Sequence, residues 1–164
     1  MQSLKRLNHE YKQYLNDIPS CYSIEIDPNN FYLWKILLFG PLETIFEGGI
    51  FECKLKFPND YPNSPPEFIF ITKLFHPNIY PNGKMCISIL NQGNNVNDDF
   101  TLLYEHISER WNPSHNVNSI LLSILTIIAN PNFESSANIE ATLMWQKNWK
   151  KYKNKIYNII SESQ

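Results

Sequence analysis

Four stretches of alternating apolar and polar residues between positions 22 and 71 constrain the fold most strongly. Alternation with a period of two is typical of a strand with one buried face. Turn-forming residues separate the stretches, at Asp27-Pro28-Asn29-Asn30, Gly40-Pro41 and Gly48-Gly49. Consecutive strands joined by short turns pair in the antiparallel sense. The sequence therefore predicts an antiparallel meander of four strands, over residues 22–26, 31–39, 50–57 and 68–71.

Helical periodicity flanks the predicted sheet on both sides in the sequence. A first helix is predicted by apolar residues that recur three or four positions apart, at Leu4, Leu7, Tyr11, Tyr14 and Leu15. A long apolar run over residues 117–128 predicts a central helix that packs across the sheet and stops at Asn130-Pro131. Two C-terminal helices are predicted over about 138–145 and 149–160. The fold class is therefore α+β, with residues 1–164 forming a single domain.

The composition narrows the classes of partner. The formal net charge is −2, so no positive field attracts nucleic acid or an anionic membrane. Three cysteines, Cys21, Cys53 and Cys86, are widely spaced and include no Cys-x-x-Cys pair, which argues against a disulfide framework or a zinc site. The longest apolar stretch, 120–129, is too short to span a bilayer. We expect no cofactor, no metal and no direct membrane insertion.

The stretch from His76 to Cys86 predicts a rigid loop. Pro77 and Pro81 fix their own φ angles, and Asn82-Gly83 is a strong tight-turn pair, so neither a helix nor a central strand fits here. Cys86 leaves this loop and enters a short apolar segment. A lone cysteine among apolar neighbours is more often a small buried side chain than a nucleophile. From these residues alone, both interpretations stay open.

Several motifs in a fixed order resemble the ubiquitin-conjugating enzymes. His76-Pro77-Asn78, then a glycine, then a cysteine ten residues after the histidine is similar to the active-site signature of that family. Further similar motifs extend over the chain, at Gly40-Pro41, 57–62, Pro65-Pro66, Trp111-Asn112-Pro113 and the long apolar helix that follows. The resemblance implies an acyltransferase that accepts ubiquitin from the activating enzyme as a thioester and transfers it to a lysine amine, usually with a ubiquitin ligase.

The same resemblance implies roles for residues of the loop. Acyl transfer by a thiol needs an exposed sulfur and a donor for the tetrahedral oxyanion. Cys86 is the candidate nucleophile and Asn78 the candidate oxyanion donor, although an asparagine here can also satisfy turn amides. His76 is interpreted as a residue that hydrogen-bonds the loop, in preference to a general base of the cysteine-protease kind. Weaker supporting candidates are Ser88, Asp98, Asp99, Glu134 and Ser135.

The resemblance also implies three partner surfaces. Lys5, Arg6 and His9 on the exposed face of the first helix would dock the activating enzyme. Leu122 and Thr126 would face the donor ubiquitin. A RING-type ligase would bind a patch that consists of Pro62, Asn63, Trp111, Pro113 and Ser114. The family often has a large apolar residue where this chain has Asn63, so the choice of ligase is expected to differ. The substrates would be lysine-bearing proteins.

A polar segment at about 91–109 resembles the acidic loop that one subgroup of the family carries beside its active site. The alternative is a low-complexity surface insertion. This chain has Asn91 where the subgroup has a histidine, which puts any mechanism based on that histidine in doubt. The subgroup implies lysine-48-linked chains, disposal of misfolded proteins from the endoplasmic reticulum, and a cytoplasmic protein held by a partner at the cytosolic face of that organelle.

Three other functions remain open from the sequence. The first is a conjugating enzyme for another ubiquitin-like modifier, and the second is a non-catalytic interaction module on the same fold. The third is a cysteine hydrolase that uses Cys86 with His76 as its base.

Overall fold

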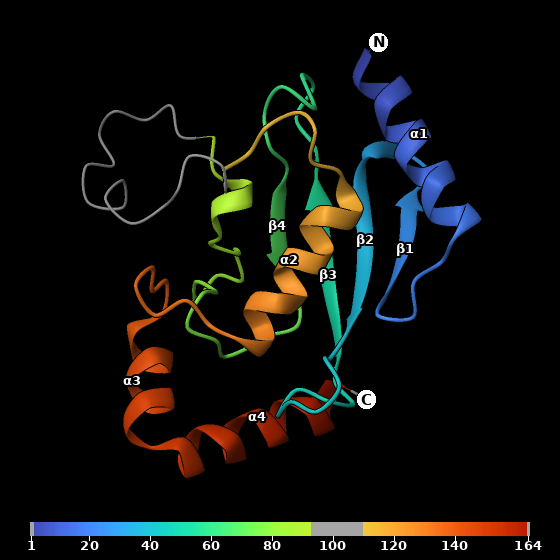
Figure 1. The fold of residues 1–164 in the computed structure, drawn as a ribbon. Helices are drawn as coiled ribbons and strands as arrows, with labels where there is room; N and C mark the ends of the chain where they lie inside the picture. The colour runs from blue at the N-terminus through green and yellow to red at the C-terminus, as the bar shows by residue number, and fades with distance from the viewer. Residues whose placement is uncertain (1, 93–109, 164) are drawn as a thin grey trace.

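The computed structural model describes residues 2–92 and 110–163. Its sheet contains four strands, β1 (Tyr22–Asp27), β2 (Asn30–Phe39), β3 (Ile50–Lys56) and β4 (Glu67–Phe70), in the order β1-β2-β3-β4 (Figure 1). Every neighbouring pair is antiparallel. This is the predicted meander, with each strand boundary within one residue of the prediction.

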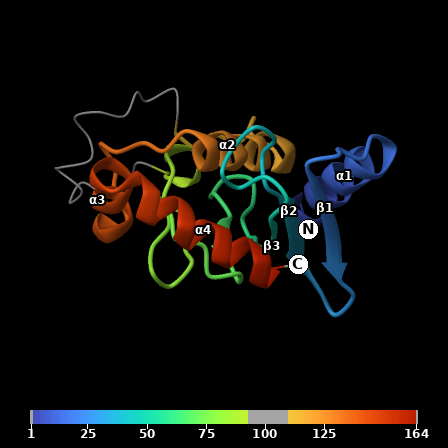
Figure 2. The ribbon, with the colours of Figure 1, turned by 90° about the horizontal axis from the view of Figure 1, so that it is seen from below.

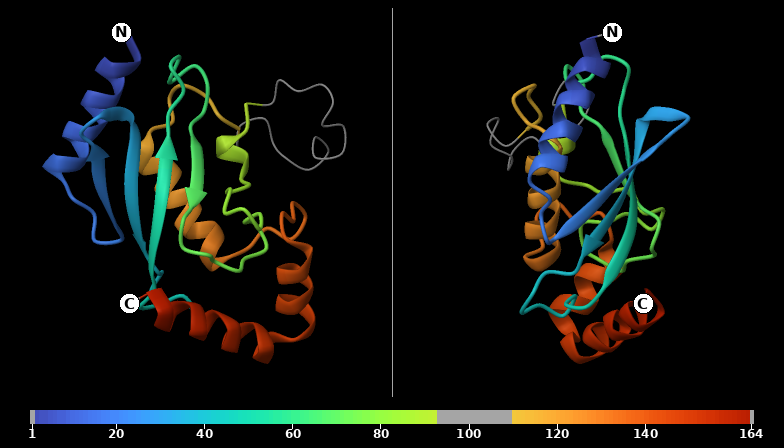
Figure 3. Two further views of the ribbon diagram at one scale, coloured as in Figure 1. Left: turned by 180° about the vertical axis from the view of Figure 1, so that it is seen from behind. Right: turned by 90° about the vertical axis from the view of Figure 1, so that its right-hand side faces the viewer.

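In the described residues, four α-helices and one short 3-10 helix accompany the sheet, in agreement with the predicted α+β fold. They are α1 (Gln2–Asn16), η1 (Ser88–Leu90), α2 (Val117–Ala129), α3 (Ile139–Lys147) and α4 (Trp149–Ser163). Figure 2 shows α2 over one face of the sheet, with α1 at the β1 edge. Seen from behind (Figure 3, left), the other face is in front, and none of the described helices covers it. No helix within residues 2–92 and 110–163 is long and apolar enough to cross a membrane.

The core lies between α2 and the sheet. Six apolar side chains of α2 are buried, and they pack with alternate residues of the strands, such as Ile36, Cys53 and Leu55. A capping box starts α2, because the Asn116 side chain accepts from the backbone of Ser119 at 2.8 Å. The helix ends at Ala129, immediately before Asn130-Pro131, as predicted. The capping box and Asn130-Pro131 therefore set the two ends of α2, and the core holds the helix between them.

The packing face of α1 differs in part from the prediction. Its buried residues are Ser3, Leu7 and Glu10, so two of the three are polar. Leu15, which was expected in the apolar stripe, is 51% exposed. At 100° per residue, Leu15 lies roughly 110° around the helix from the centre of the observed face. Ser3 and Glu10 can be buried because both are hydrogen-bonded, so the face of α1 that packs against the core is partly polar.

Candidate active site

The loop of residues 76–86 is held by its own backbone hydrogen bonds. Gly83 N donates to Tyr80 O at 2.8 Å, and Cys86 N donates to Asn78 O at 3.0 Å. Gly83 has a φ of 89°, and a Cβ at this position would lie 2.2 Å from the carbonyl oxygen of Phe70. Only glycine fits a positive φ with so close an approach. The rigid loop predicted from the sequence is therefore present.

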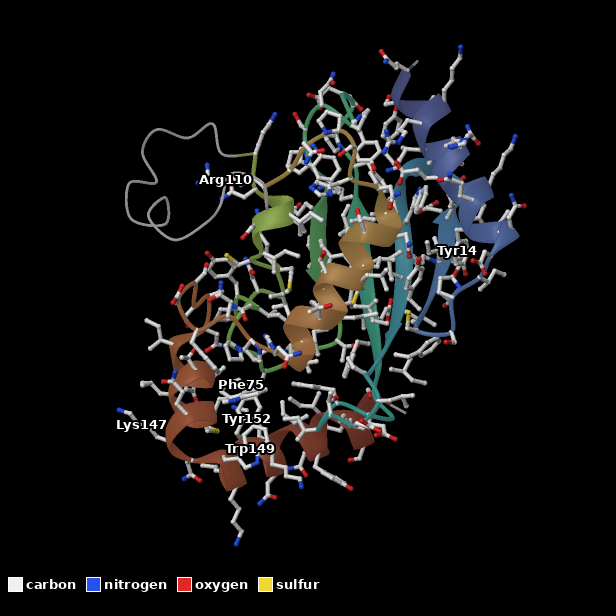
Figure 4. All side chains as sticks on the ribbon, viewed as in Figure 1. Tyr14, Phe75, Arg110, Lys147, Trp149 and Tyr152 are labelled. Carbon is white, nitrogen blue, oxygen red and sulfur yellow. The ribbon has the colours of Figure 1, made fainter. Side chains whose placement is uncertain are left out.

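Helix α4 holds the entrance of this loop. Tyr152 donates its hydroxyl hydrogen to the carbonyl oxygen of Phe75 at 2.7 Å, and the two rings lie next to each other (Figure 4). Burial raises the pKa of Tyr152, so the hydroxyl keeps the proton that it donates. The residue directly before His76 is thus tied to the C-terminal helix.

His76 is fully buried and both of its ring nitrogens are engaged. Nδ1 accepts from Asn78 N at 3.0 Å, which leaves the hydrogen on Nε2, 3.3 Å from the carbonyl oxygen of Ile128. Burial lowers the pKa of His76 to about 4, and its hydrogen bond to the Ile128 carbonyl opposes this only in part. The imidazole is therefore neutral at pH 7. This geometry fits the predicted hydrogen-bonding role and disfavours the cysteine-hydrolase interpretation.

Asn78 is also buried, and its side chain pairs with the loop that follows α2. Its Nδ2 donates to the carbonyl oxygens of Asn132 at 2.7 Å and Ser135 at 2.9 Å. Its Oδ1 accepts from Asn132 N at 2.9 Å. Both amide hydrogens are therefore occupied in this structure. The loop-satisfying role is observed, and the oxyanion role stays a prediction.

Cys86 lies at the rim of the 76–86 loop, where it is partly exposed. It lines a hollow of about 750 Å³ that we call the cysteine groove, whose lining includes Pro65, Glu67, Tyr80, Lys84, Leu90 and Ser135. Cys53, by contrast, is fully buried on β3, and burial raises the pKa of its thiol. Cys86 therefore has the access that a nucleophile needs, and Cys53 does not.

A second, much smaller cavity brings several predicted residues together. It has a volume of about 30 Å³, and its lining includes Asn78, Cys86, Ser88, Asn132 and Ser135. Glu134 is exposed and lines neither this cavity nor the cysteine groove. Asp98 and Asp99 lie outside the described residues, as does the predicted inserted loop from residue 93 onward. The structure thus supports Ser88 and Ser135 as neighbours of the sulfur.

A buried carboxylate, which the sequence analysis missed, connects α1 to the start of α2. Glu10 accepts from the Tyr61 hydroxyl at 2.7 Å and from Val117 N at 2.7 Å, and it forms an ion pair with Arg6. Arg6 also donates to the carbonyl oxygens of Pro113 at 3.1 Å and His115 at 2.8 Å. Arg6 is thus only partly exposed, with 27% of its side chain accessible, where a fully exposed basic face was expected. These two hydrogen bonds hold the 113–115 segment. The charge of Arg6 also compensates Glu10, which would be costly to bury without a partner.

Trp111 is likewise placed differently from the prediction. It is 7% exposed, and its Nε1 donates to the carbonyl oxygen of Pro62 at 2.9 Å. It therefore joins the two loops of the predicted ligase patch from beneath and does not form part of an exposed surface. Asn63, Pro113 and Ser114 are exposed, and Pro62 is partly so.

Comparison with known proteins addresses the family directly. The family profile described as ubiquitin-conjugating enzyme matches residues 6–160. The chain is 42% identical over 162 residues to ubiquitin-conjugating enzyme E2 G2 of Homo sapiens and of Bos taurus, covering 98% of this chain and 96% of each relative. It is also 42% identical over 139 residues to probable ubiquitin-conjugating enzyme E2 7 of Caenorhabditis elegans, covering 85% of this chain and 82% of that relative.

This chain belongs to the ubiquitin-conjugating enzyme family. It is a transferase of the ubiquitin conjugation pathway that works through a cysteine thioester, as predicted. Its general partners are ubiquitin, the activating enzyme and ubiquitin ligases.

The remaining predicted surface residues of this ubiquitin-conjugating enzyme are accessible. Lys5 and His9 are exposed on α1, and Thr126 is exposed on α2. Leu122, one turn before Thr126, is 46% exposed, which is unusual for a helix whose other apolar residues are mostly buried. Exposure of this kind is what a protein-binding surface requires.

Proposed function

We propose that Cys86 is the residue that carries ubiquitin. The observation that carries this proposal is its position at the rim of the fixed 76–86 loop, open to the cysteine groove. The Cys86 thiolate attacks the thioester carbonyl of ubiquitin on the activating enzyme, and the C–S bond to that enzyme breaks as its thiolate leaves. The amine of a lysine then attacks the new carbonyl. Collapse of the tetrahedral intermediate breaks the C–S bond, returns the Cys86 thiolate and releases the amine proton to water.

The oxyanion of that intermediate requires a nearby hydrogen-bond donor. We assign this role to Asn78, whose backbone accepts from Cys86 N at 3.0 Å and whose side chain borders the cavity beside the sulfur. In this role, Asn78 Nδ2 exchanges one of its hydrogen bonds, to the carbonyl oxygen of Asn132 or of Ser135, for a hydrogen bond to the oxyanion as the negative charge develops. Ser135 is a supporting residue for the approach of the lysine and Glu134 is a weaker one, whereas Ser88 is a supporting residue on the side of donor ubiquitin.

The partner surfaces of the proposal lie at different places around Cys86. Lys5 and His9 on α1 contact the activating enzyme. A RING-type ligase binds the exposed atoms of Pro62, Asn63, Pro113 and Ser114, which Trp111 and Arg6 hold together from beneath. Donor ubiquitin folds back on Leu122 and Thr126 of α2. The acceptors are lysine-bearing proteins.

We also propose membership of the subgroup with an extended acidic loop. The segment from Asn91 to Trp111 supports it by its length and by its acidic residues, Asp98 and Asp99 among them. The matches to the E2 G2 relatives cover nearly all of both chains, which leaves little room for an insertion present in only one of them. Lysine-48-linked chains and a cytoplasmic location at the face of the endoplasmic reticulum, through a partner, belong to the same proposal.

A thioester assay tests the assignment of Cys86. The purified chain is incubated with activating enzyme, ATP and ubiquitin, then separated on a gel with and without a thiol reductant. Wild type is expected to form an adduct that the reductant removes, and Cys86→Ser an adduct that resists it. Cys53→Ala and Cys21→Ala should keep the reductant-sensitive adduct. Loss of the adduct in Cys21→Ala, with Cys86→Ala still active, would reject the proposal.

A further inference from the structure

A second large hollow adjoins the cysteine groove. It lies between β4 and α4, has a volume of about 720 Å³, and we call it the helix groove; Ile71, Phe75 and Ile159 are among its apolar walls. Tyr80 and Asn82 line both hollows, so only this turn of the 76–86 loop separates them. The two hollows therefore adjoin at this turn, with Cys86 in one and the apolar walls next to α4 in the other.

The walls of the two hollows favour an apolar occupant. Tyr80 is 43% exposed and Ile71 is 42% exposed, although both are large apolar side chains beside a hollow. The charged groups balance: Glu67 and Lys84 form an ion pair at 3.1 Å in the cysteine groove. The helix groove is bordered by two lysines and two glutamates, Lys73, Lys155, Glu140 and Glu162. Lys155 Nζ lies 3.6 Å from the centre of the Phe75 ring, so its charge is directed onto an aromatic face.

The surfaces proposed for donor ubiquitin and for the ligase do not extend into the helix groove, and neither does the α1 surface proposed for the activating enzyme. The exposed Leu122 and Thr126 are on α2, which covers the opposite face of the sheet (Figure 2). Pro62 and Asn63 precede β4, whereas Ile71 follows it. The helix groove adjoins the hollow that contains the reacting sulfur, and its lining includes none of the residues of these surfaces. Donor ubiquitin and the ligase already have surfaces of their own in the proposed function, so the acceptor, whose lysine has to approach the sulfur, is the partner left for the helix groove.

We propose that the two grooves bind an extended segment of the acceptor protein, with its lysine at Cys86 and an aliphatic or aromatic side chain in the helix groove. This inference rests on the proposed function, because it takes Cys86 as the reacting residue. Hollows of these volumes are roughly 9 Å across, so at about 3.3 Å per residue the apolar side chain falls roughly three to five residues from the lysine.

Single-turnover discharge to peptides tests this. The chain is loaded with ubiquitin, the activating enzyme is removed, and the thioester is mixed with peptides that contain one lysine. One peptide has leucine four residues before the lysine, one has leucine four residues after it, and one has serine at both places. At least one leucine peptide is expected to react about tenfold faster than the serine peptide at sub-saturating concentration, since partial burial of one leucine supplies that much.

A matched pair of variants locates the effect. Ile71→Ser removes an apolar wall of the helix groove, and Leu37→Ser removes a similarly exposed side chain, 40% against 42%, outside it. Ile71→Ser should abolish the advantage of the leucine peptide, whereas Leu37→Ser should keep it. Thermal unfolding midpoints of the two variants confirm that both are folded.

Free lysine is the reference acceptor. It has no flanking residues, so Ile71→Ser should discharge to it at the wild-type rate. Equal rates for the leucine and serine peptides, or an equal loss of the leucine advantage in both variants, would overturn the inference while leaving the proposed function intact. Failure to load Cys86, or to discharge to free lysine, would instead reject the proposed function. If Ile71→Ser slowed discharge to free lysine only when a ligase is present, the groove would be a ligase site and the acceptor proposal would be wrong.

Discussion

The two ends of α2 hold neighbouring segments by different chemistry. At the C-terminal end, neutral groups do so: the His76 ring bonds the Ile128 carbonyl, and the Asn78 amide bonds the 132–135 segment. At the N-terminal end a charge does so, because Glu10 accepts from Val117 and Tyr61 and pairs with Arg6. The first end fixes the loop that carries Cys86. The second fixes the loops of the proposed ligase surface.

The difference indicates which perturbations each end tolerates. Buried neutral groups such as His76 and Asn78 are stable when all their hydrogen bonds are made, and they hold the Cys86 loop without a buried charge. A buried carboxylate is stable only with its partners present, so the loss of one partner leaves an uncompensated charge and destabilises the whole cluster. Substitutions at the C-terminal end of α2 should therefore slow the transfer of ubiquitin itself. Substitutions at the N-terminal end should weaken the acceleration of that transfer by a ligase.

The largest effect is expected for Asn78→Ala. It leaves the carbonyl oxygens of Asn132 and Ser135 and the Asn132 amide without this partner, so we expect a loss of about 2–4 kcal/mol in the free energy of unfolding. Discharge of ubiquitin to free lysine should fall about a hundredfold, and loading far less. Urea unfolding and single-turnover kinetics measure the two.

Asn116→Ala is the control for that change. It removes the asparagine cap at the other end of α2 and should cost about 1 kcal/mol with discharge unchanged. If Asn78→Ala slowed loading and discharge equally, Asn78 would have no part in the chemistry.

Glu10→Gln is expected to have the next largest effect. A glutamine oxygen cannot accept from all the groups that Glu10 now serves, and the ion pair with Arg6 is lost, so we expect a loss of about 2–3 kcal/mol in the free energy of unfolding. Acceleration of discharge by a ligase should weaken, while discharge to free lysine without ligase stays at the wild-type rate. A fall of both rates by the same factor would contradict the separation of the two ends.

The pH dependence of stability tests the neutral state of His76. Its pKa is about 4 in the folded protein, below the ordinary 6.5, so the unfolded chain binds a proton first as pH falls. The stability that the neutral ring supports is present above pH 6.5 and is lost between 6.5 and 4. From pH 7 to pH 5 this amounts to about 2 kcal/mol. The difference in free energy of unfolding between wild type and His76→Gln should shrink by this amount over that interval, and a constant difference would exclude a lowered pKa.

The smallest stability effect is expected for Leu122→Ala. This side chain is 46% exposed, so the free energy of unfolding should change by no more than about 0.5 kcal/mol. Discharge should nevertheless slow about three- to tenfold, since one partly buried contact with donor ubiquitin is removed. Tyr157→Ala, at a position 67% exposed on α4, should alter neither. Unchanged discharge in Leu122→Ala would remove α2 from the donor surface.

The sequence predicts the strands and helices closely because alternation, periodicity and turn residues are local signals. The same holds for the rigid loop before Cys86, where Pro77, Pro81 and Gly83 restrict the backbone directly. What could not be predicted is which distant groups pair. Asn78 bonds residues 54 and 57 positions away, and Trp111 bonds a carbonyl 49 positions earlier.

Glu10 illustrates the same limit. An acid four residues after Arg6 on a helix is most often a solvated ion pair. Its burial follows from the approach of Val117, 107 positions later in the chain. Only the folded structure reveals that Arg6 hydrogen-bonds the 113–115 segment.

The most direct test of this account is the site at which ubiquitin attaches. Cys86→Ser is loaded with ubiquitin, digested with protease, and the peptide that carries the ubiquitin remnant is identified by mass spectrometry. The account predicts a single ester at residue 86. A remnant at any other residue, with residue 86 unmodified, would contradict it.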